Sequence, residues 1–190
     1  MLEKYWTQRF DDALPIAHSF HDSHRDCWVR FHSLPESKRY AESKLEWTTL
    51  LERHNAVLTA LASDGSQLEL LTTNWSNSDS PGLPHEQFCK LQLSAKHWRT
   101  VAMHEFDGDP APNYWHIFRT SISWTHGALD DVIRLVADDH LSNVMILDPN
   151  KSWLLHPYDG GMDVILGSTA QRDALSRKFK HWRSSRADGL

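Results

Sequence analysis

Cysteine is scarce in this sequence, and long apolar runs are missing. The 190 residues contain two cysteines, Cys27 and Cys89. They lie far apart without metal-ligand or redox spacing, so we expect reduced thiols in a reducing compartment. The N-terminus has no apolar run typical of an export signal, and no stretch approaches the roughly 18 uncharged residues of a membrane-spanning helix. These absences argue against a disulfide-stabilised scaffold and predict a cytoplasmic protein without membrane association.

Catalytic signature motifs are also missing. The sequence has no HExxH, CxxC, GxSxG or P-loop pattern, so it indicates no catalytic residues and leaves open whether the protein is an enzyme. His18, His21 and His24 are spaced by three, which on a helix would place their imidazoles near one face, where they can bind a transition metal. No fourth ligand pattern accompanies them, and Asp22 and Asp26 suit a solvated loop equally well. We therefore expect neither a metal nor a cofactor.

Positive charge is in short supply overall. The formal net charge of -5 argues against general nucleic-acid binding, which requires an excess of Lys and Arg. The excess is local, because residues 168–190 contain six basic and two acidic residues. This segment suits a solvated helix face or, alternatively, a basic helix that docks on an acidic partner.

Hydrophobic spacing predicts the fold. Apolar residues at three- and four-residue intervals predict helices over 2–13, 37–61, 125–136 and 168–182. Alternating, β-branched or aromatic runs predict strands over 27–32, 67–73, 96–106, 114–124, 143–147, 152–156 and 162–166. Strands grouped between helices favour an α+β class, with a mainly antiparallel sheet packed with about four helices. We expect one domain over 1–190, with an N-terminal helix and polar lead-in at 1–26 and a core at 27–190.

The first candidate site is the stretch from residue 30 to residue 40, which runs from a predicted strand end into a predicted helix start. Such a geometry gathers backbone N–H groups, which can hold a phosphate or a carboxylate. Ser37 is the expected helix cap. The alternative is an ordinary capped helix whose basic residues pair with surface acids. The candidate ligand-binding residues are Arg30, His32, Ser37, Lys38 and Arg39.

The second candidate site is the stretch from Trp153 to Val164. Its turn contains a histidine, a tyrosine and two aspartates, which are the groups that general acid–base chemistry uses, because a histidine titrates near neutrality and a carboxylate can orient it. The alternative is a plain hairpin, since Asp-Gly is a common turn pair. The candidate residues are His156, Tyr158, Asp159 and Asp163.

Two elements resemble a known family. They are Trp28-Val29-Arg30-Phe31 followed by the long helix, and the hairpin from His156 to Ile165 followed by a helix. Together they resemble the bacterial family of domain of unknown function 3885, over roughly Trp28 to Trp182. The family's more usual Asp-Arg-Gly turn is Asp159-Gly160-Gly161 here. The resemblance implies a small bacterial cytoplasmic protein, and it assigns no activity to particular residues.

Two functions fit these observations. The first is a protein-binding module, such as an immunity protein that neutralises a cognate toxin, because the chain is acidic and its nine tryptophans include candidates for interface anchors. Tryptophans within amphipathic segments usually pack in the core instead. The second is an enzyme or binder of a small anionic ligand at a cleft formed by the 30–40 and 156–163 stretches. The sequence leaves open whether these stretches meet and which oligomeric state the protein adopts.

Overall fold

The computed structural model describes residues 2–108, 111–184 and 186. Within these residues, seven strands pair antiparallel throughout in one sheet, in the order β1-β7-β6-β5-β2-β4-β3. The predicted α+β class with a mainly antiparallel sheet is confirmed. The strands are β1 (Trp28–His32), β2 (Gln67–Ser76), β3 (Lys96–Ala102), β4 (Tyr114–Ser123), β5 (Met145–Leu147), β6 (Trp153–Tyr158) and β7 (Gly161–Leu166).

Four predicted helices are present. They are α1 (Leu2–Phe10), α3 (Lys44–Leu61), α6 (Asp130–Ala137) and α7 (Thr169–Lys178). Three shorter helices, which the hydrophobic spacing did not indicate, are α2 (Phe20–Ser23), α4 (Glu86–Cys89) and α5 (Met103–Asp107). Helices of four or five residues span barely one turn, too short to show a periodic pattern.

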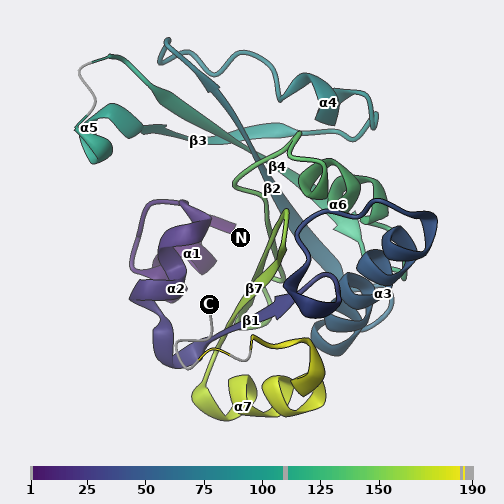
Figure 1. Ribbon diagram of the computed structural model, residues 1–190. Helices are drawn as coiled ribbons and strands as arrows, with labels where there is room; N and C mark the ends of the chain where they lie inside the picture. The colour runs from purple at the N-terminus through teal and green to yellow at the C-terminus, as the bar shows by residue number, and fades with distance from the viewer. Residues whose placement is uncertain (1, 109–110, 185, 187–190) are drawn as a thin grey trace.

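The helices cover both faces of the sheet (Figure 1). Alternate strand residues such as Leu70, Ile146 and Val164 pack in one core cluster with α3, α6 and α7. Residues that point the opposite way, such as Leu154 and Ile165, pack in a second cluster with α1 and α2. The two-residue period of a strand therefore separates two cores, one on each side of the sheet.

The prediction that the long helix begins at Ser37 is wrong. α3 begins after Ser43, whose Oγ accepts a hydrogen bond from the Glu46 N–H while the Glu46 carboxylate accepts one from the Ser43 N–H. This reciprocal pair satisfies two backbone donors that a helix start leaves free. Ser37 instead lies in a short 3-10 turn with a positive φ of 58°. No α-helix start therefore gathers backbone N–H groups between residues 30 and 40.

Three other element boundaries differ from the predictions by four residues or more. The predicted strand 96–106 ends at Ala102, and α5 follows it. The helix expected near residue 125 begins at Asp130. The last helix starts after its predicted cap Ser168 but ends at Lys178, and a 3-10 turn follows (Lys180–Trp182). Among the described residues, no helix combines the length and apolar character needed to cross a bilayer.

Asn143 ties the N-terminal segment to the sheet. It is buried, and its Oδ1 accepts a hydrogen bond from the Ala17 N–H at 2.7 Å. Its Nδ2 donates to the Pro15 carbonyl at 2.9 Å and to the Thr73 Oγ1 at 2.8 Å. One amide thus holds residues 15–17 against β2, because a buried polar group that loses its partner is costly. This link also fixes the position of the neighbouring His18.

Replacing Asn143 by Ala should destabilise the fold by about 3 kcal/mol, because two buried backbone groups would lose their partner. The measurement is urea unfolding followed by tryptophan fluorescence. Asn150→Ala is the control, since Asn150 is exposed and should change stability little. Equal stability of the two variants would contradict the role assigned to Asn143.

Candidate functional site

Strand register places the two candidate stretches side by side. β7 lies between β1 and β6, so that Arg30 and His156 are both cross-strand partners of Asp163. His32 and Tyr158 are likewise both partners of Gly161. Cross-strand partners point to the same face of a sheet. These side chains therefore extend the face covered by α1 and α2, where the apolar residues give way to polar ones.

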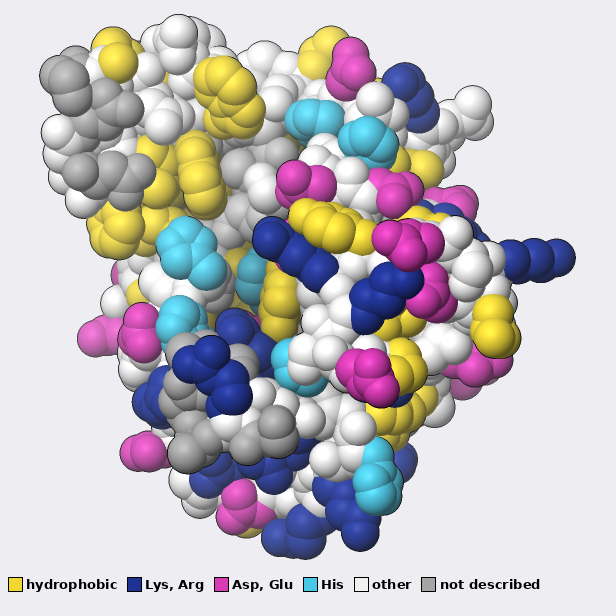
Figure 2. Space-filling view, in the orientation of Figure 1, with side chains coloured by type: hydrophobic (Ala, Val, Ile, Leu, Met, Phe, Trp, Pro, Cys, Tyr) yellow, Lys and Arg dark blue, Asp and Glu magenta, His cyan; other side chains and the backbone are white. Residues whose placement is uncertain are grey.

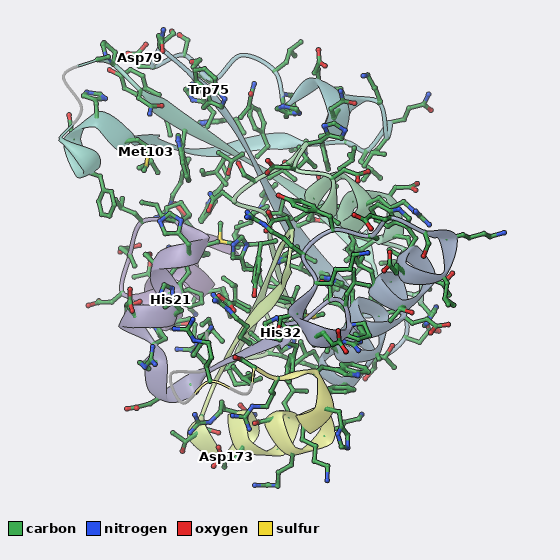
Figure 3. The ribbon with its side chains drawn as sticks, in the orientation of Figure 1. His21, His32, Trp75, Asp79, Met103 and Asp173 are labelled. Carbon is green, nitrogen blue, oxygen red and sulfur yellow. The ribbon has the colours of Figure 1, made fainter. Side chains whose placement is uncertain are left out.

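These side chains line a cleft of about 470 Å³, which we call the hairpin cleft. Eight of the nine residues proposed from the sequence contribute to it, and they come from both candidate stretches. Its lining residues are His18, Arg30, His32, Ser37, Arg39, His156, Tyr158, Asp159, Gly160 and Asp163. In Figure 3, His32 lies on β1 near the middle of the molecule. The sheet thus brings together groups that are more than 100 residues apart in the sequence.

Lys38 is the one proposed residue that does not line the hairpin cleft. Its Nζ donates to the carboxylates of Glu42 and Glu46 at 2.9 Å and 2.7 Å. These contacts raise the pKa of Lys38 above its usual value. Lys38 therefore follows the alternative stated for this stretch, in which basic residues pair with surface acids.

Each arginine of the cleft is paired with an aspartate. Arg30 binds Asp163 through Nε and Nη2 at 2.7 Å and 2.8 Å, a bidentate arrangement that fixes both groups. This pair is largely buried, and the Arg30 guanidinium also lies 5.0 Å from the centre of the Tyr158 ring. Arg39 binds Asp159, but its side chain is 65% exposed. The Arg30–Asp163 pair is therefore a fixed part of the cleft lining, whereas the Arg39–Asp159 pair lies at the cleft's solvent edge.

His156 is held as a neutral imidazole. Its Nδ1 lies 2.8 Å from the Val144 carbonyl oxygen, so Nδ1 carries the proton and donates. Burial lowers the pKa of His156, and the hydrogen bond to Val144 and the charge of Asp163 oppose that effect. The remaining nitrogen, Nε2, then has a lone pair and can accept a hydrogen bond or a proton.

His32 and Tyr158 are neutral as well. Burial, together with the positive charges of Arg30 and Arg53, lowers the pKa of His32. Burial raises the pKa of Tyr158 far above its usual value, with Asp163 adding to the effect and Arg30 opposing it. Tyr158 therefore keeps its hydroxyl proton at neutral pH and can donate a hydrogen bond. The buried Nε2 of His32 has no hydrogen-bond partner among the described residues.

The glycine at position 161 makes room for Tyr158. A Cβ built on Gly161 would lie 2.3 Å from the Phe31 carbonyl oxygen and 2.8 Å from the Tyr158 hydroxyl. At Gly160 the nearest atom to such a Cβ is on the Tyr158 ring at 3.5 Å, an ordinary contact. The turn thus requires glycine at 161 but tolerates a side chain at 160, which is the position of arginine in the Asp-Arg-Gly turn.

A second pocket of about 240 Å³ adjoins the hairpin cleft and shares His18, Arg39, His156, Tyr158 and Asp159 with it. Its other residues are Pro157, which belongs to the second candidate stretch, and residues from two segments that the sequence did not indicate: Trp115, Val136, Asp139, Leu141, Ser142 and Asn143. No local motif marks these residues, because only the folding of the chain brings them together. The sequence did mark His18, because it is one of the three evenly spaced histidines.

Two of those three histidines, His21 and His24, form polar contacts within their own segment, whereas His18 lines both cavities. The Nε2 of His21 lies 3.3 Å from the Asp22 carboxylate, and the Nδ1 of His24 lies 2.9 Å from the Ser23 hydroxyl. In the part of the chain that the structure describes, no group of three or more His, Cys, Asp or Glu side chains is arranged to hold a metal ion.

Comparison with known proteins identifies a family. A family model described as "Domain of unknown function (DUF3885)" matches residues 16–187. Neither the curated proteins nor the solved structures contain a match. The matched segment includes the hairpin cleft but leaves out α1.

Gly161→Ala should lower the free energy of unfolding by about 2 kcal/mol or more, because the new methyl group would collide with backbone. Gly160→Ala is the matched control one residue away and should be nearly neutral. Urea unfolding of both variants measures the difference. A harmless alanine at position 161 would contradict the close packing of Tyr158 over this residue.

Acid should weaken the fold through His156. Because the pKa of His156 lies below 6.5 in the folded protein, the unfolded chain binds more protons below that pH. Its contribution to stability is therefore complete above pH 6.5 and decreases as the pH falls below that value. A long-range ¹H–¹⁵N NMR titration should show that the pKa of His156 lies below that of an ordinary histidine, with the neutral ring protonated at Nδ1. An unshifted or raised pKa would contradict the prediction.

Proposed function

The chain belongs to the DUF3885 family, and we propose that it binds a small anionic ligand in the hairpin cleft. The observation that supports this proposal most strongly is the convergence of two distant stretches, which place two guanidinium groups and two neutral histidines around one cavity. A volume of about 470 Å³ lies within the range of small-molecule sites, roughly 300–1,000 Å³.

Arg39 is the expected anion contact. Arg39 pairs with Asp159, and the Arg39 side chain is largely exposed to solvent. Ion pairs at solvent-exposed positions contribute little net stability. A phosphate or carboxylate of the ligand can therefore replace or share that contact at low cost. The Arg30–Asp163 pair is more deeply buried and bidentate, so it would shape the site rather than exchange partners. Recognition of the anion would then rest on side chains, since no α-helix start lies within the 30–40 stretch.

The neutral groups would recognise the rest of the ligand. The Nε2 of His156 can accept a hydrogen bond from a ligand hydroxyl or amine, and the Tyr158 hydroxyl can donate one. If the ligand is a substrate, His156 is the group suited to accept its proton, because its imidazole is held neutral. The ligand chemistry that fits is a small polar molecule with one anionic end.

A protein partner is the second candidate, and one exposed apolar surface favours it. Eight of the nine tryptophans are buried or half-buried, which leaves Trp75 as the most exposed candidate for an interface anchor. Trp75 is 66% exposed, and Leu83 and Phe106 are also exposed. Hydrophobic side chains gather where β3, α5 and the ends of β2 and β4 project from the body (Figure 2). Trp75 lies well away from His32 and the hairpin cleft (Figure 3). If the protein is an immunity protein, its toxin would dock on this apolar surface. The cytoplasmic location of the protein stays a prediction from the sequence.

Arg39→Gln should weaken ligand binding at least about tenfold, because it removes a charge-assisted contact. Native mass spectrometry of protein purified gently from its own host should reveal a small bound mass on the wild type. The same mass should be missing from Arg39→Gln. Arg177→Gln is the matched control, since Arg177 is exposed on α7, and it should retain the ligand.

Retention of the mass by Arg39→Gln would place the ligand elsewhere. If the wild type carries no small mass, titration with phosphate- and carboxylate-bearing metabolites should shift the NMR signals of His156 and Tyr158. Unchanged signals of both residues would refute the proposal. A stoichiometric second protein instead of a small mass would favour the toxin-neutralising function.

A further inference from the structure

A second groove lies at the opposite end of β6 from the hairpin cleft. It runs between α1 and the turn that joins β5 to β6, and its volume is about 390 Å³. We call it the α1 groove. Its lining residues are Lys4, Tyr5, Gln8, Arg9, Pro149, Asn150, Lys151 and Ser152.

Both walls of the α1 groove are anchored to the sheet. The Tyr5 hydroxyl donates to the Trp153 carbonyl at 3.1 Å, and Arg9 Nη2 donates to the Leu166 carbonyl at 2.5 Å. On the other wall, the Asp148 carboxylate accepts from the Asn150 N–H at 2.8 Å, and the Asp148 carbonyl accepts from the Lys151 N–H at 3.0 Å. The groove is therefore a fixed feature of the fold rather than a space between loosely packed segments.

The α1 groove has unbalanced positive charge. Three cationic side chains line it, Lys4, Arg9 and Lys151, and none of its lining residues is acidic. Within the described chain, none of the three forms a salt bridge, and the buried Nε of Arg9 has no hydrogen-bond acceptor. In the hairpin cleft, by contrast, each arginine already has an aspartate.

Among the described residues, Asp148 is an acidic neighbour of this groove, but it does not cancel the positive excess. Burial raises the pKa of Tyr5 far above its usual value, so Tyr5 remains an uncharged phenol. Asp148 is close enough to influence Tyr5, but it is buried outside the groove lining and supplies one charge against three. The side chains of Gln8, Asn150 and Ser152 add neutral hydrogen-bond donors to the groove.

We propose that the α1 groove binds a phosphate group. Three cations and several neutral donors match a dianion with several acceptor oxygens better than a carboxylate, which has one charge and two oxygens. A groove of about 390 Å³ is larger than the ion alone requires, so the phosphate belongs to a small organic phosphate monoester. The site is independent of the hairpin cleft, and its α1 residues precede the segment 16–187 that matches the family model.

The test is a titration of the purified full chain with sodium phosphate and with glycerol 3-phosphate, each compared with sodium chloride and sodium acetate at equal ionic strength. Binding is followed by calorimetry and by the side-chain amide NMR signals of Gln8 and Asn150. We expect both phosphates to shift these two signals, with tighter binding of the monoester. The double variant Lys4→Gln/Lys151→Gln should weaken phosphate binding at least about tenfold.

The matched control is Lys44→Gln/Lys96→Gln, which removes the same charge from two exposed lysines elsewhere and should leave the affinity unchanged. Arg39→Gln should likewise leave the Gln8 and Asn150 shifts intact, which separates this site from the hairpin cleft. The proposal is overturned if neither phosphate shifts the two amide signals, if acetate shifts them equally, or if both double variants lose affinity alike. Tighter binding of inorganic phosphate than of the monoester would overturn the monoester assignment.

Discussion

The position of β7 between β1 and β6 is the constraint on which the rest of the candidate site depends. This pairing sets Arg30, Asp163 and His156 in one cross-strand row and His32, Gly161 and Tyr158 in the next. The neighbouring residues Phe31 and Met162 point the opposite way, into the core beneath α3 and α7. A register shift of one residue would bury the charged row and expose the apolar one, so the core on one face fixes the polar site on the other.

The two polar cavities at the ends of β6 differ in whether their cationic side chains have acidic partners. In the hairpin cleft the arginines are paired with aspartates, which offsets the cost of partly burying them and holds their geometry. In the α1 groove the cations have no such carboxylate partners among the described residues, and Arg9 and Lys151 donate to backbone carbonyls, of Leu166 and Leu61. The first arrangement favours shape and hydrogen-bond recognition, whereas the second favours attraction of a strongly charged group.

Much of the local structure follows from residue patterns. The alternation in Trp28–His32 and the Asp159-Gly160 turn indicate the strand and hairpin that the structure contains, and the proposed site residues are on them. The start of α3 was misplaced because Ser37 and Ser43 are both plausible caps, and the choice depends on the Glu46 carboxylate closing the box at Ser43. The same error affects Lys38, which pairs with Glu42 and Glu46 near the true helix start instead of lining the cleft.

The sequence by itself determined the α+β class, the four longer helices and the identity of the hairpin residues, because these depend on periodicity and turn chemistry within short segments. Only the tertiary structure decided that Arg39 reaches Asp159 and that Trp115 and Asn143 join the neighbouring pocket. It also placed Lys4 and Arg9 opposite Lys151. These contacts join residues that are far apart along the chain, and strand order and helix packing, which no local pattern encodes, bring them together.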